Sequence, residues 1–236
     1  MTAVIFTHPP DYPKAAIAAA SLRRLGVDTT WAIDANDPTD GIPPEIPVIR
    51  SSVPRNGNLR GPQWTAEQLA IMASVGSGHD WVIKIDSDTV VGRLCWLKSA
   101  LPHHDLAGMF LLHPGMTVPR LYGGLYAIRP ESITAARLDS IASLPVNSDD
   151  NEDRIVGMLF PSARNHAFRH DRQSGMMAGF DRDSPWTAAD WFDRYNAVSV
   201  NPNRRMEKHQ RLTESAQTMR YLLDHLLTVP PVQSCI

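Results

Sequence analysis

The chain has 236 residues, of which 43% are hydrophobic and 20% charged, so it can form one sizeable α/β domain with at most a small appendage. Its net charge of -2 and pI near 6.5 exclude the strongly basic field that marks many nucleic-acid-binding and membrane-surface proteins. No run approaches the roughly 20 apolar residues of a membrane-spanning helix.

The first third of the chain alternates apolar strands with helices. The runs "AVIFTH" and "VDTTWAID" predict strands, and "PKAAIAAASLRRLG" between them predicts a helix closed by Gly26. After a proline-rich connector and the polar loop "NGNLRGPQ", the run "WTAEQLAIMASV" predicts a second helix, with Thr65 and Gln68 in a capping box. The next strand is "WVIKID". This strand-helix-strand order favours a parallel sheet.

The remaining chain continues the pattern less regularly. Helices are predicted in "RLCWLKSAL", from Pro130 to about Ser143, in "DRIVGMLF" and in "RRMEKHQRLTESAQTMRYLLDHLL". Short strands are predicted in "DLAGMFLL", "GGLYAI", "HAFRH" and "NAVSV". We therefore expect one α/β domain over residues 1–200, with a mainly parallel central sheet flanked by helices, and a C-terminal helical extension over residues 201–236 packed on it.

Two carboxylates stand one residue apart where the run "WVIKID" ends. Open α/β sheets bind ligands at the carboxyl ends of their strands, and Asp86 and Asp88 fall there. Residues i and i+2 of an extended chain project to the same side, so both carboxylates can face one ligand. Mn²⁺ or Mg²⁺ would take these oxygens together with substrate phosphates and water, and would relieve their repulsion. The structural alternative is a surface turn in which "DSD" caps the next helix, because an isolated Asp-x-Asp is common.

The segment "WVIKIDSDTVV" resembles the Asp-x-Asp segment of GT-A-fold glycosyltransferases, and "NEDRIVGMLF" is similar to the Glu-Asp-x-x-x-Gly segment of that family. The resemblance covers roughly residues 3 to 200 and implies a single Rossmann-like GT-A domain. It implies that Asp86 and Asp88 hold Mn²⁺ or Mg²⁺, with Ser87 between them at the donor. That cation bridges the diphosphate of a nucleotide-sugar, for which a UDP-sugar is the favoured donor.

The same resemblance implies further contacts to the donor. Thr7 and His8 end the first strand, where the family begins its nucleotide pocket, and Asp34 ends the second strand, where an acidic residue contacts the base or ribose. Arg60, in the polar loop before the second helix, is a candidate donor contact. For His8, Arg60 and Asp34 a plain loop or turn role is about as strongly expected.

Inverting members of the family need a base for the acceptor hydroxyl, and the resemblance assigns this role to Asp153 first and Glu152 second. The alternative is a solvated acidic helix start, which the helix dipole favours. A retaining enzyme would not need the base. Many members also supply a third metal ligand, for which His209, Asn201 or water are the candidates here.

Two other functions fit parts of the pattern. In a haloacid-dehalogenase-type phosphohydrolase, "DSDTV" would supply Asp86 as the nucleophile and Asp88 as its acid/base partner. That motif usually lies near the start of such chains, and the expected downstream lysine is missing between Lys98 and Lys208. The third reading is a binding module for nucleotide-sugars without catalysis, which the intact carboxylates make the weakest.

The sequence leaves the acceptor open: a glycan, a lipid-linked sugar, a protein side chain or a hydroxymethylated DNA base. Arginines in the later half of the chain keep a DNA base among the possible acceptors, although nearby acidic residues nearly balance their charge. The oligomeric state is open as well. Cys95 and Cys235 form neither a disulfide framework nor a zinc site, and Cys95 is expected as a small buried thiol. Because the start "MTAVIFTHPP" also lacks a signal-peptide pattern, we expect a cytoplasmic protein.

Overall fold

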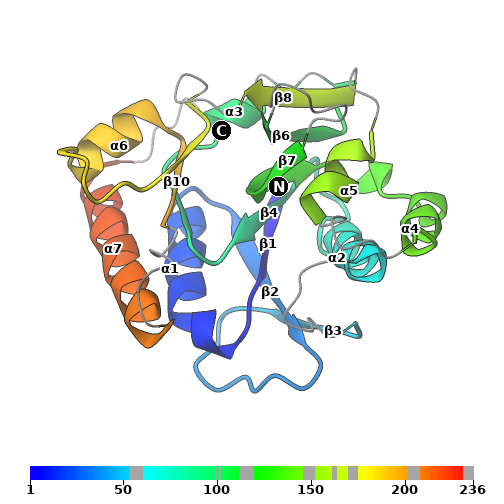
Figure 1. Cartoon of the computed structure of the whole chain (residues 1–236), viewed down its shortest axis with the longest axis horizontal. Coiled ribbons are helices and arrows are strands. Elements are labelled where there is room, and N and C mark those ends of the chain that lie inside the picture. The colour runs from blue at the N-terminus through cyan, green and yellow to red at the C-terminus, as the bar shows by residue number, and fades with distance from the viewer. Residues whose placement is uncertain are drawn as a thin grey trace.

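The chain forms a seven-stranded sheet with helices on both faces and a separate three-stranded sheet (Figure 1). The computed structural model describes residues 1–53, 61–98, 100, 102–111, 120–145, 152–160, 164–169, 175–200 and 208–230. The side chains of residues 111, 120, 167–169 and 208–211 also lie outside that description. No helix among these residues is long and apolar enough to cross a bilayer.

The main sheet has the strand order β3-β2-β1-β4-β7-β6-β8. Its strands are β1 (Thr2–Phe6), β2 (Asp28–Asp34), β3 (Val48–Ser51), β4 (Val82–Asp86), β6 (Leu106–Leu111), β7 (Arg120–Ile128) and β8 (Asn165–Arg169). The first four strands in this order are parallel to one another, as are β6 and β8. The expected mainly parallel sheet is therefore confirmed.

The exception is β7, which runs antiparallel to both of its neighbours. Its register pairs Lys84 with Tyr126 and Ile85 with Leu125. Because the direction is reversed, the beginning of β7 lies at the carboxyl end of β4. Tyr122 and Gly123 therefore reach the same edge of the sheet as the residues that follow β4.

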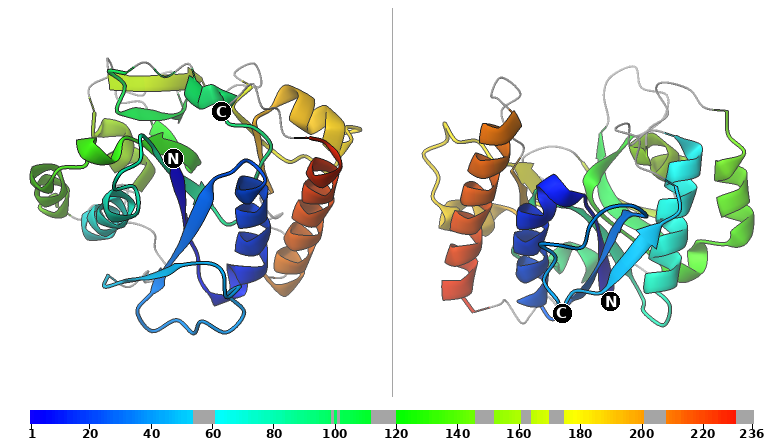
Figure 2. Two further views of the ribbon diagram at one scale, coloured as in Figure 1. Left: turned by 180° about the vertical axis from the view of Figure 1, so that it is seen from behind. Right: turned by 90° about the horizontal axis from the view of Figure 1, so that it is seen from below.

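Helices cover both faces of the main sheet, so the molecule has three layers (Figure 1). The helices are α1 (Tyr12–Arg23), α2 (Pro62–Val75), α3 (Cys95–Lys98), α4 (Ala135–Ala142), α5 (Glu152–Met158), α6 (Ala188–Arg194) and α7 (Lys208–Thr228), with short 3-10 turns η1 (Pro9–Asp11) and η2 (Pro130–Ser132). One buried cluster lies under α1 and α7, and a second lies under α2, α4 and α5. Figure 2 shows α7 lying alongside α1 in both views.

The C-terminal helix packs on the rest of the chain, as expected. Met219, Leu222, Leu223 and Leu226 of α7 are buried in the same cluster as the apolar face of α1. The division of the chain at residue 200 stays a prediction.

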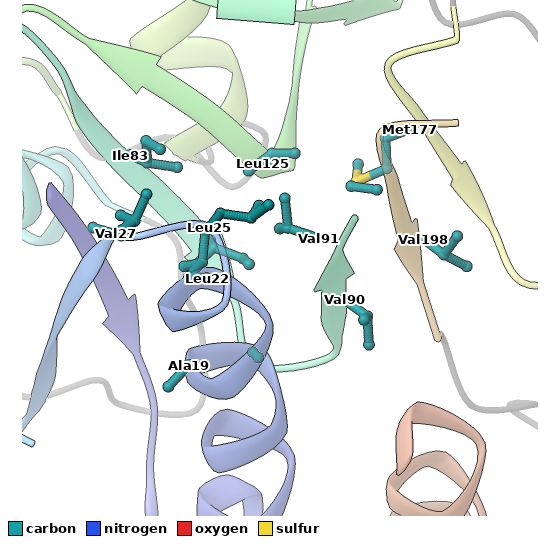
Figure 3. Packing of buried hydrophobic residues seen from close by; sticks show 14 of the residues in the cluster. Ala19, Leu22, Leu25, Val27, Ile83, Val90, Val91, Leu125, Met177 and Val198 are labelled. Carbon is teal, nitrogen blue, oxygen red and sulfur yellow. The ribbon is translucent and has the colours of Figure 1, made fainter. Parts of the chain in front are cut away.

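The small sheet joins the segment that follows Asp88 to the main core. It contains β5 (Thr89–Val91), β9 (Met177–Gly179) and β10 (Ala197–Ser199), in the order β5-β10-β9. Val91 and Met177 are buried in one cluster with Leu22 and Leu125 (Figure 3). The Val91 amide also donates to Ser21 Oγ of α1 at 3.0 Å. The strand that follows Asp88 is thus fixed on two sides.

Two local expectations were wrong. The capping box at Thr65 does not form, because α2 begins at Pro62, whose missing N–H suits the first turn. Thr65 is instead buried inside the helix, where its hydroxyl donates to the Gly61 carbonyl at 3.2 Å, and Gln68 is buried as well. Cys95 is half-buried and disulfide-bonded, not a free thiol. Since disulfides are typical of oxidising compartments, this bond gives no support to the predicted cytoplasmic location.

Candidate functional site

Asp86 and Asp88 lie at the carboxyl end of β4, as the sequence predicted. The Asp86 side chain is 45% exposed, Asp88 is half-buried and Ser87 between them is buried. Burial, and next the charge of Asp86, raise the pKa of Asp88 to about 7. The Val200 amide donates to the Asp88 carbonyl at 2.7 Å and holds the turn against β10. Two carboxylates that repel each other are therefore fixed at one edge of the sheet.

A buried lysine lies behind this pair. Lys84 Nζ donates to Asp86 Oδ1 at 2.6 Å and to the Gly123 carbonyl, and it lies 3.5 Å from Glu152 Oε1. Only 4% of its side chain is exposed. Burial lowers the pKa of Lys84, but the charges of Asp86 and Glu152 raise it by more, so the net shift is upward. The ammonium stays charged and is neutralised by acids on two different elements.

The acidic pair that begins α5 has two unlike members. Glu152 is 5% exposed, and its Oε1 accepts from the Tyr126 hydroxyl at 2.8 Å. When the Gln68 amide is oriented to accept from Trp64 Nε1, it donates to Glu152 Oε2 at 3.1 Å. Both carboxylate oxygens of Glu152 are thus occupied by contacts with buried residues of the protein.

Asp153 is half-buried and lies against the beginning of β7. A methyl group placed on Gly123 would overlap Asp153 Oδ1, so the carboxylate needs a residue without a side chain there. Burial lowers the pKa of Lys84, whereas the charges of Asp86, Glu152 and Asp153 raise it, with Asp153 contributing the least of the three. Asp153 therefore lies on the same side of the sheet edge as the Asp86 carboxylate.

Tyr122 connects the two acidic pairs. Its ring lies across Gly124, and Ser199 of β10 is among its neighbours. Burial first, and then the charges of Asp88 and Asp86, raise the pKa of Tyr122, with a smaller contribution from Asp153. The phenol therefore lies within electrostatic reach of both acidic pairs.

Charged residues from the start of α1 lie on the other side of Asp88. Asp11 accepts from Lys14 Nζ at 2.8 Å and lies 3.3 Å from His8 Nδ1. The charge of Lys14 lowers the pKa of Asp88, and that of Asp11 raises it, both by less than burial does. His8 follows β1, so the carboxyl ends of β1 and β4 contribute to one charged region.

Thr7 precedes His8 and is buried, with 2% exposure. Its amide donates to the Ala32 carbonyl at 3.0 Å, whereas its hydroxyl has no hydrogen-bond partner within the described ranges. Buried polar groups are nearly always paired, so a buried hydroxyl of this kind calls for an explanation.

The end of β2 lies further along the same edge. Arg50 Nη1 donates to the carbonyls of Asp34, Ala35 and Asp37 at 3.3, 2.7 and 2.9 Å, which fixes the turn after the strand. Asp34 is half-buried. Burial, then the charge of Asp37, raise the pKa of Tyr12, to which Asp34 also contributes. Asp34 therefore lies near an aromatic ring at this edge.

Solved structures of glycosyltransferases share this architecture at low sequence identity. A glycosyltransferase involved in the glycosylation of the major capsid of PBCV-1 matches with a TM-score of 0.57 and 11% identity over 93% of this chain and 98% of that chain. The galactosyltransferase LgtC, in complex with donor and acceptor sugar analogs, matches with a TM-score of 0.51 and 14% identity over 92% and 96% of the two chains. The chain has a GT-A-like fold.

A third similar structure is the apo form of GlyE from Streptococcus pneumoniae, with a TM-score of 0.57 and 17% identity. The match covers 98% of this chain and 65% of GlyE, so the chain spans less than two thirds of that protein. No protein-family model matches the chain, and no curated protein matches it in sequence. At these identities the structural likeness establishes the fold alone.

Within the GT-A-like fold, the residues named from sequence fall into three groups. The structure brings seven of them to the carboxyl edge of β1 and β4 or to the facing start of α5, namely Thr7, His8, Asp86, Ser87, Asp88, Glu152 and Asp153. Asp34 lies at the end of β2 on the same edge. Arg60 and Asn201 lie outside the described residues, and of His209 only the backbone is described, in the first turn of α7.

Several residues of this region were not singled out from sequence, among them Lys14, Tyr122 and Ser199. Lys14 is the only charge between Tyr12 and Leu22 of the alanine-rich α1, and that isolation was a usable signal. Tyr122 and Ser199 carry no such signal, because they meet only through the direction of β7 and the pairing of β10 with β5.

Proposed function

We propose that the protein is a metal-dependent glycosyltransferase that moves a sugar from a nucleotide-sugar donor, preferably a UDP-sugar, to an acceptor hydroxyl. One observation carries the proposal. In a fold shared with solved glycosyltransferases, Asp86 and Asp88 stand at the carboxyl end of β4, and the Asp153 carboxylate lies against Gly123 at the adjacent start of β7. This edge is where open α/β sheets bind their ligands.

The residues present fit a hard divalent cation. Asp86 and Asp88 offer carboxylate oxygens, the ligand type that Mn²⁺ and Mg²⁺ prefer. Asp86 is accessible, and the like charge of Asp86 helps to raise the pKa of Asp88, so a cation between them would relieve repulsion. The described residues contain no group of three His, Cys, Asp or Glu side chains suited to a metal. Phosphate oxygens, water or His209 would complete the shell.

In the proposed reaction the acceptor oxygen attacks the anomeric carbon of the donor. The bond from that carbon to the diphosphate oxygen breaks, and its electron pair leaves with the nucleoside diphosphate. A cation held by Asp86 and Asp88 would stabilise the charge that grows on this leaving group. The proposed reaction is a single displacement with inversion at the anomeric carbon, and Asp153 accepts the proton of the acceptor hydroxyl. Glu152 is the weaker candidate for this role, because it is buried and already accepts from Tyr126.

The donor's nucleotide would occupy the edge formed by the ends of β1 and β2. Thr7 supports this placement, because its buried hydroxyl lacks a partner among the described residues and a bound nucleotide could supply one. His8 follows β1 and Asp34 ends β2, and these two strands are neighbours in the sheet. Ser87, in the turn between the two carboxylates, is proposed to face the donor phosphates through its backbone.

For the acceptor, a glycan hydroxyl is preferred over a modified DNA base. Two of the arginines that kept DNA open are already paired: Arg164 donates twice to Asp105, at 2.7 and 2.6 Å, and Arg182 donates to Glu214 at 2.6 Å. Paired arginines are poor phosphate ligands unless the partner is displaced. Salt-dependent binding of duplex DNA to the purified protein would reverse this preference.

A donor screen tests the proposal. The purified protein is heated in the presence of Mn²⁺ with UDP-, GDP- or TDP-sugars, and the melting temperature and the release of nucleotide are recorded. We expect one donor to stabilise the protein only when Mn²⁺ is present, and the stabilisation to disappear in Asp88→Ala. An unchanged metal-dependent shift in Asp88→Ala would show that the proposed site is wrong.

The same assay separates the alternatives. Rapid turnover of a simple phosphate ester, with no response to any nucleotide-sugar, would favour the phosphohydrolase with Asp86 as nucleophile. Nucleotide binding that needs no metal, without sugar transfer or donor hydrolysis, would favour a binding module that does not catalyse.

A further inference from the structure

Lys84 is an unusual residue for its position. It lies in the middle of the central strand β4, and 3% of the residue is exposed. The residues on either side of it, Ile83 and Ile85, are fully buried in the apolar cluster under α1. A buried ion pair costs as much in desolvation as it returns, and apolar residues of similar volume are often at least as stable. Packing alone therefore gives no reason for a lysine here.

Lys84 Nζ has three partners on three different elements. It donates hydrogen bonds to Asp86 Oδ1 and to the Gly123 carbonyl, and it forms an ion pair with Glu152 Oε1 at 3.5 Å. Asp86 lies two residues further along the same strand, on the same face. Gly123 and Glu152 belong to β7 and α5.

Each of these three contacts fixes either Asp86 itself or a part of the chain that positions Asp153. The contact at 2.6 Å fixes Asp86 through Oδ1. The contact with Glu152 fixes the first turn of α5, whose next residue is Asp153. The contact with Gly123 fixes the stretch of β7 against which the Asp153 carboxylate lies.

We propose that Lys84 is a positioning residue, which holds the cation ligand Asp86 and the base-bearing start of α5 in one fixed relation. This inference rests on the proposed function for the roles of Asp86 and Asp153. Lys84 acts by orienting Asp86, in the way that outer-sphere partners orient metal ligands.

A simpler role makes the opposite prediction. If Lys84 served only to neutralise buried acid, its removal would leave Asp86 more negative and cation binding as strong or stronger. If Lys84 orients Asp86, its removal weakens cation binding, because the carboxylate is free to turn away. The direction of the change in Mn²⁺ affinity therefore separates the two roles.

The test uses a pair of substitutions that keeps the buried charge balanced. Lys84→Met alone leaves Glu152 buried without its cation and lowers the melting temperature. The double variant Lys84→Met/Glu152→Gln removes both charges, so we expect it to recover most of the lost stability. Mn²⁺ binding is then measured without any nucleotide, from the electron paramagnetic resonance signal of the free ion.

We expect the double variant to bind Mn²⁺ about 10- to 100-fold more weakly than the wild type, the range found when outer-sphere partners are removed. Binding as tight as in the wild type would overturn the inference. If the double variant does not fold, Lys84→Gln takes its place, with the same two outcomes. A wild-type protein that binds no Mn²⁺ would instead count against the proposed function, so the two failures are distinguishable.

Tyr126→Phe is the matched control for general loosening of this region. It removes the hydroxyl that donates to Glu152 at 2.8 Å and leaves Lys84 and Asp86 unchanged. We expect a lower melting temperature and an unchanged Mn²⁺ affinity. An equal loss of Mn²⁺ affinity in Tyr126→Phe would mean that any disturbance of the buried network has this effect, and the inference for Lys84 would fall.

Discussion

The chain contains two pairs of neighbouring acids that look alike in sequence and differ in the structure. Asp86 and Asp88 follow a strand, with Asp86 partly exposed and the pKa of Asp88 raised to about 7, first by burial and then by the charge of Asp86. In the pair that begins α5, Glu152 is buried and accepts hydrogen bonds, whereas Asp153 lies half-buried at the edge of β7. The first pair is suited to share a cation. Under the proposed function, the second pair has one buried member that anchors α5, Glu152, and one member that serves as the base, Asp153.

The largest effect is expected from a change of Asp153, the proposed base of the second pair. Asp153→Asn keeps the shape of the side chain and removes the proton acceptor. We expect kcat for sugar transfer to fall about 10²- to 10⁴-fold, the usual contribution of a general base. The melting temperature should stay close to that of the wild type, because the carboxylate is half-buried. A variant with full activity would show that the reaction needs no base at this position.

Gly123→Ala displaces Asp153 without changing it. The added methyl group would overlap Asp153 Oδ1, so the carboxylate must move. A misplacement of about 1 Å can cost on the order of 100-fold in rate, and we expect a loss of that order in kcat. The matched control is Gly179→Ala, because Gly179 has ordinary backbone angles and open space around its Cα. Equal losses in both variants would contradict the explanation.

Glu152→Gln tests the anchoring half. Because the amide keeps the shape but loses the charge that faces Lys84 and Tyr126, we expect unfolding to become easier by about 1 to 3 kcal/mol. For a chain of this size each kcal/mol lowers the melting temperature by about 2 to 4 °C. The rate should fall by much less than in Asp153→Asn. A rate loss equal to that of Asp153→Asn, with unchanged stability, would exchange the two roles.

The smallest effect concerns the edge that faces the nucleotide. Thr7→Val replaces a buried hydroxyl that has no described partner with a methyl group of similar volume. Since an unsatisfied buried group costs about 1 to 3 kcal/mol, we expect the free protein to be equally stable or slightly more stable. We also expect donor binding to weaken, which a rise in KM with unchanged kcat would show. Unchanged KM would place the nucleotide elsewhere.

The position of Asp86 and Asp88 at the carboxyl end of a strand could be predicted from sequence because its signal is local. Asp86 and Asp88 stand at i and i+2 after an apolar run, and both the strand and its end follow from that run alone. The network behind the pair could not be predicted. Lys84 meets Glu152 and Gly123 only because β7 reverses direction beside β4, and no local pattern in the sequence states that direction.

Three strands were missed for a different reason, their length. β3, β5 and β9 have three or four residues each, which leaves little room for an alternating pattern to identify a strand. The capping box predicted at Thr65 was wrong because Thr65 and Gln68 have the right spacing but lie inside the helix, which begins at Pro62. The helix α7 was predicted correctly because its apolar residues recur at helical spacing, and α1 because its run is long and rich in alanine.

The hydrogen bond from the Val200 amide to the Asp88 carbonyl has a consequence for the order in which the site is completed. During synthesis both carboxylates leave the ribosome in the first half of the chain, long before Ser199 and Val200 do. Until β10 pairs with β5, the turn that carries Asp88 lacks its hydrogen bond from the Val200 amide, and Tyr122 lacks its neighbour Ser199. A nascent or truncated chain would therefore carry the acids without their final geometry.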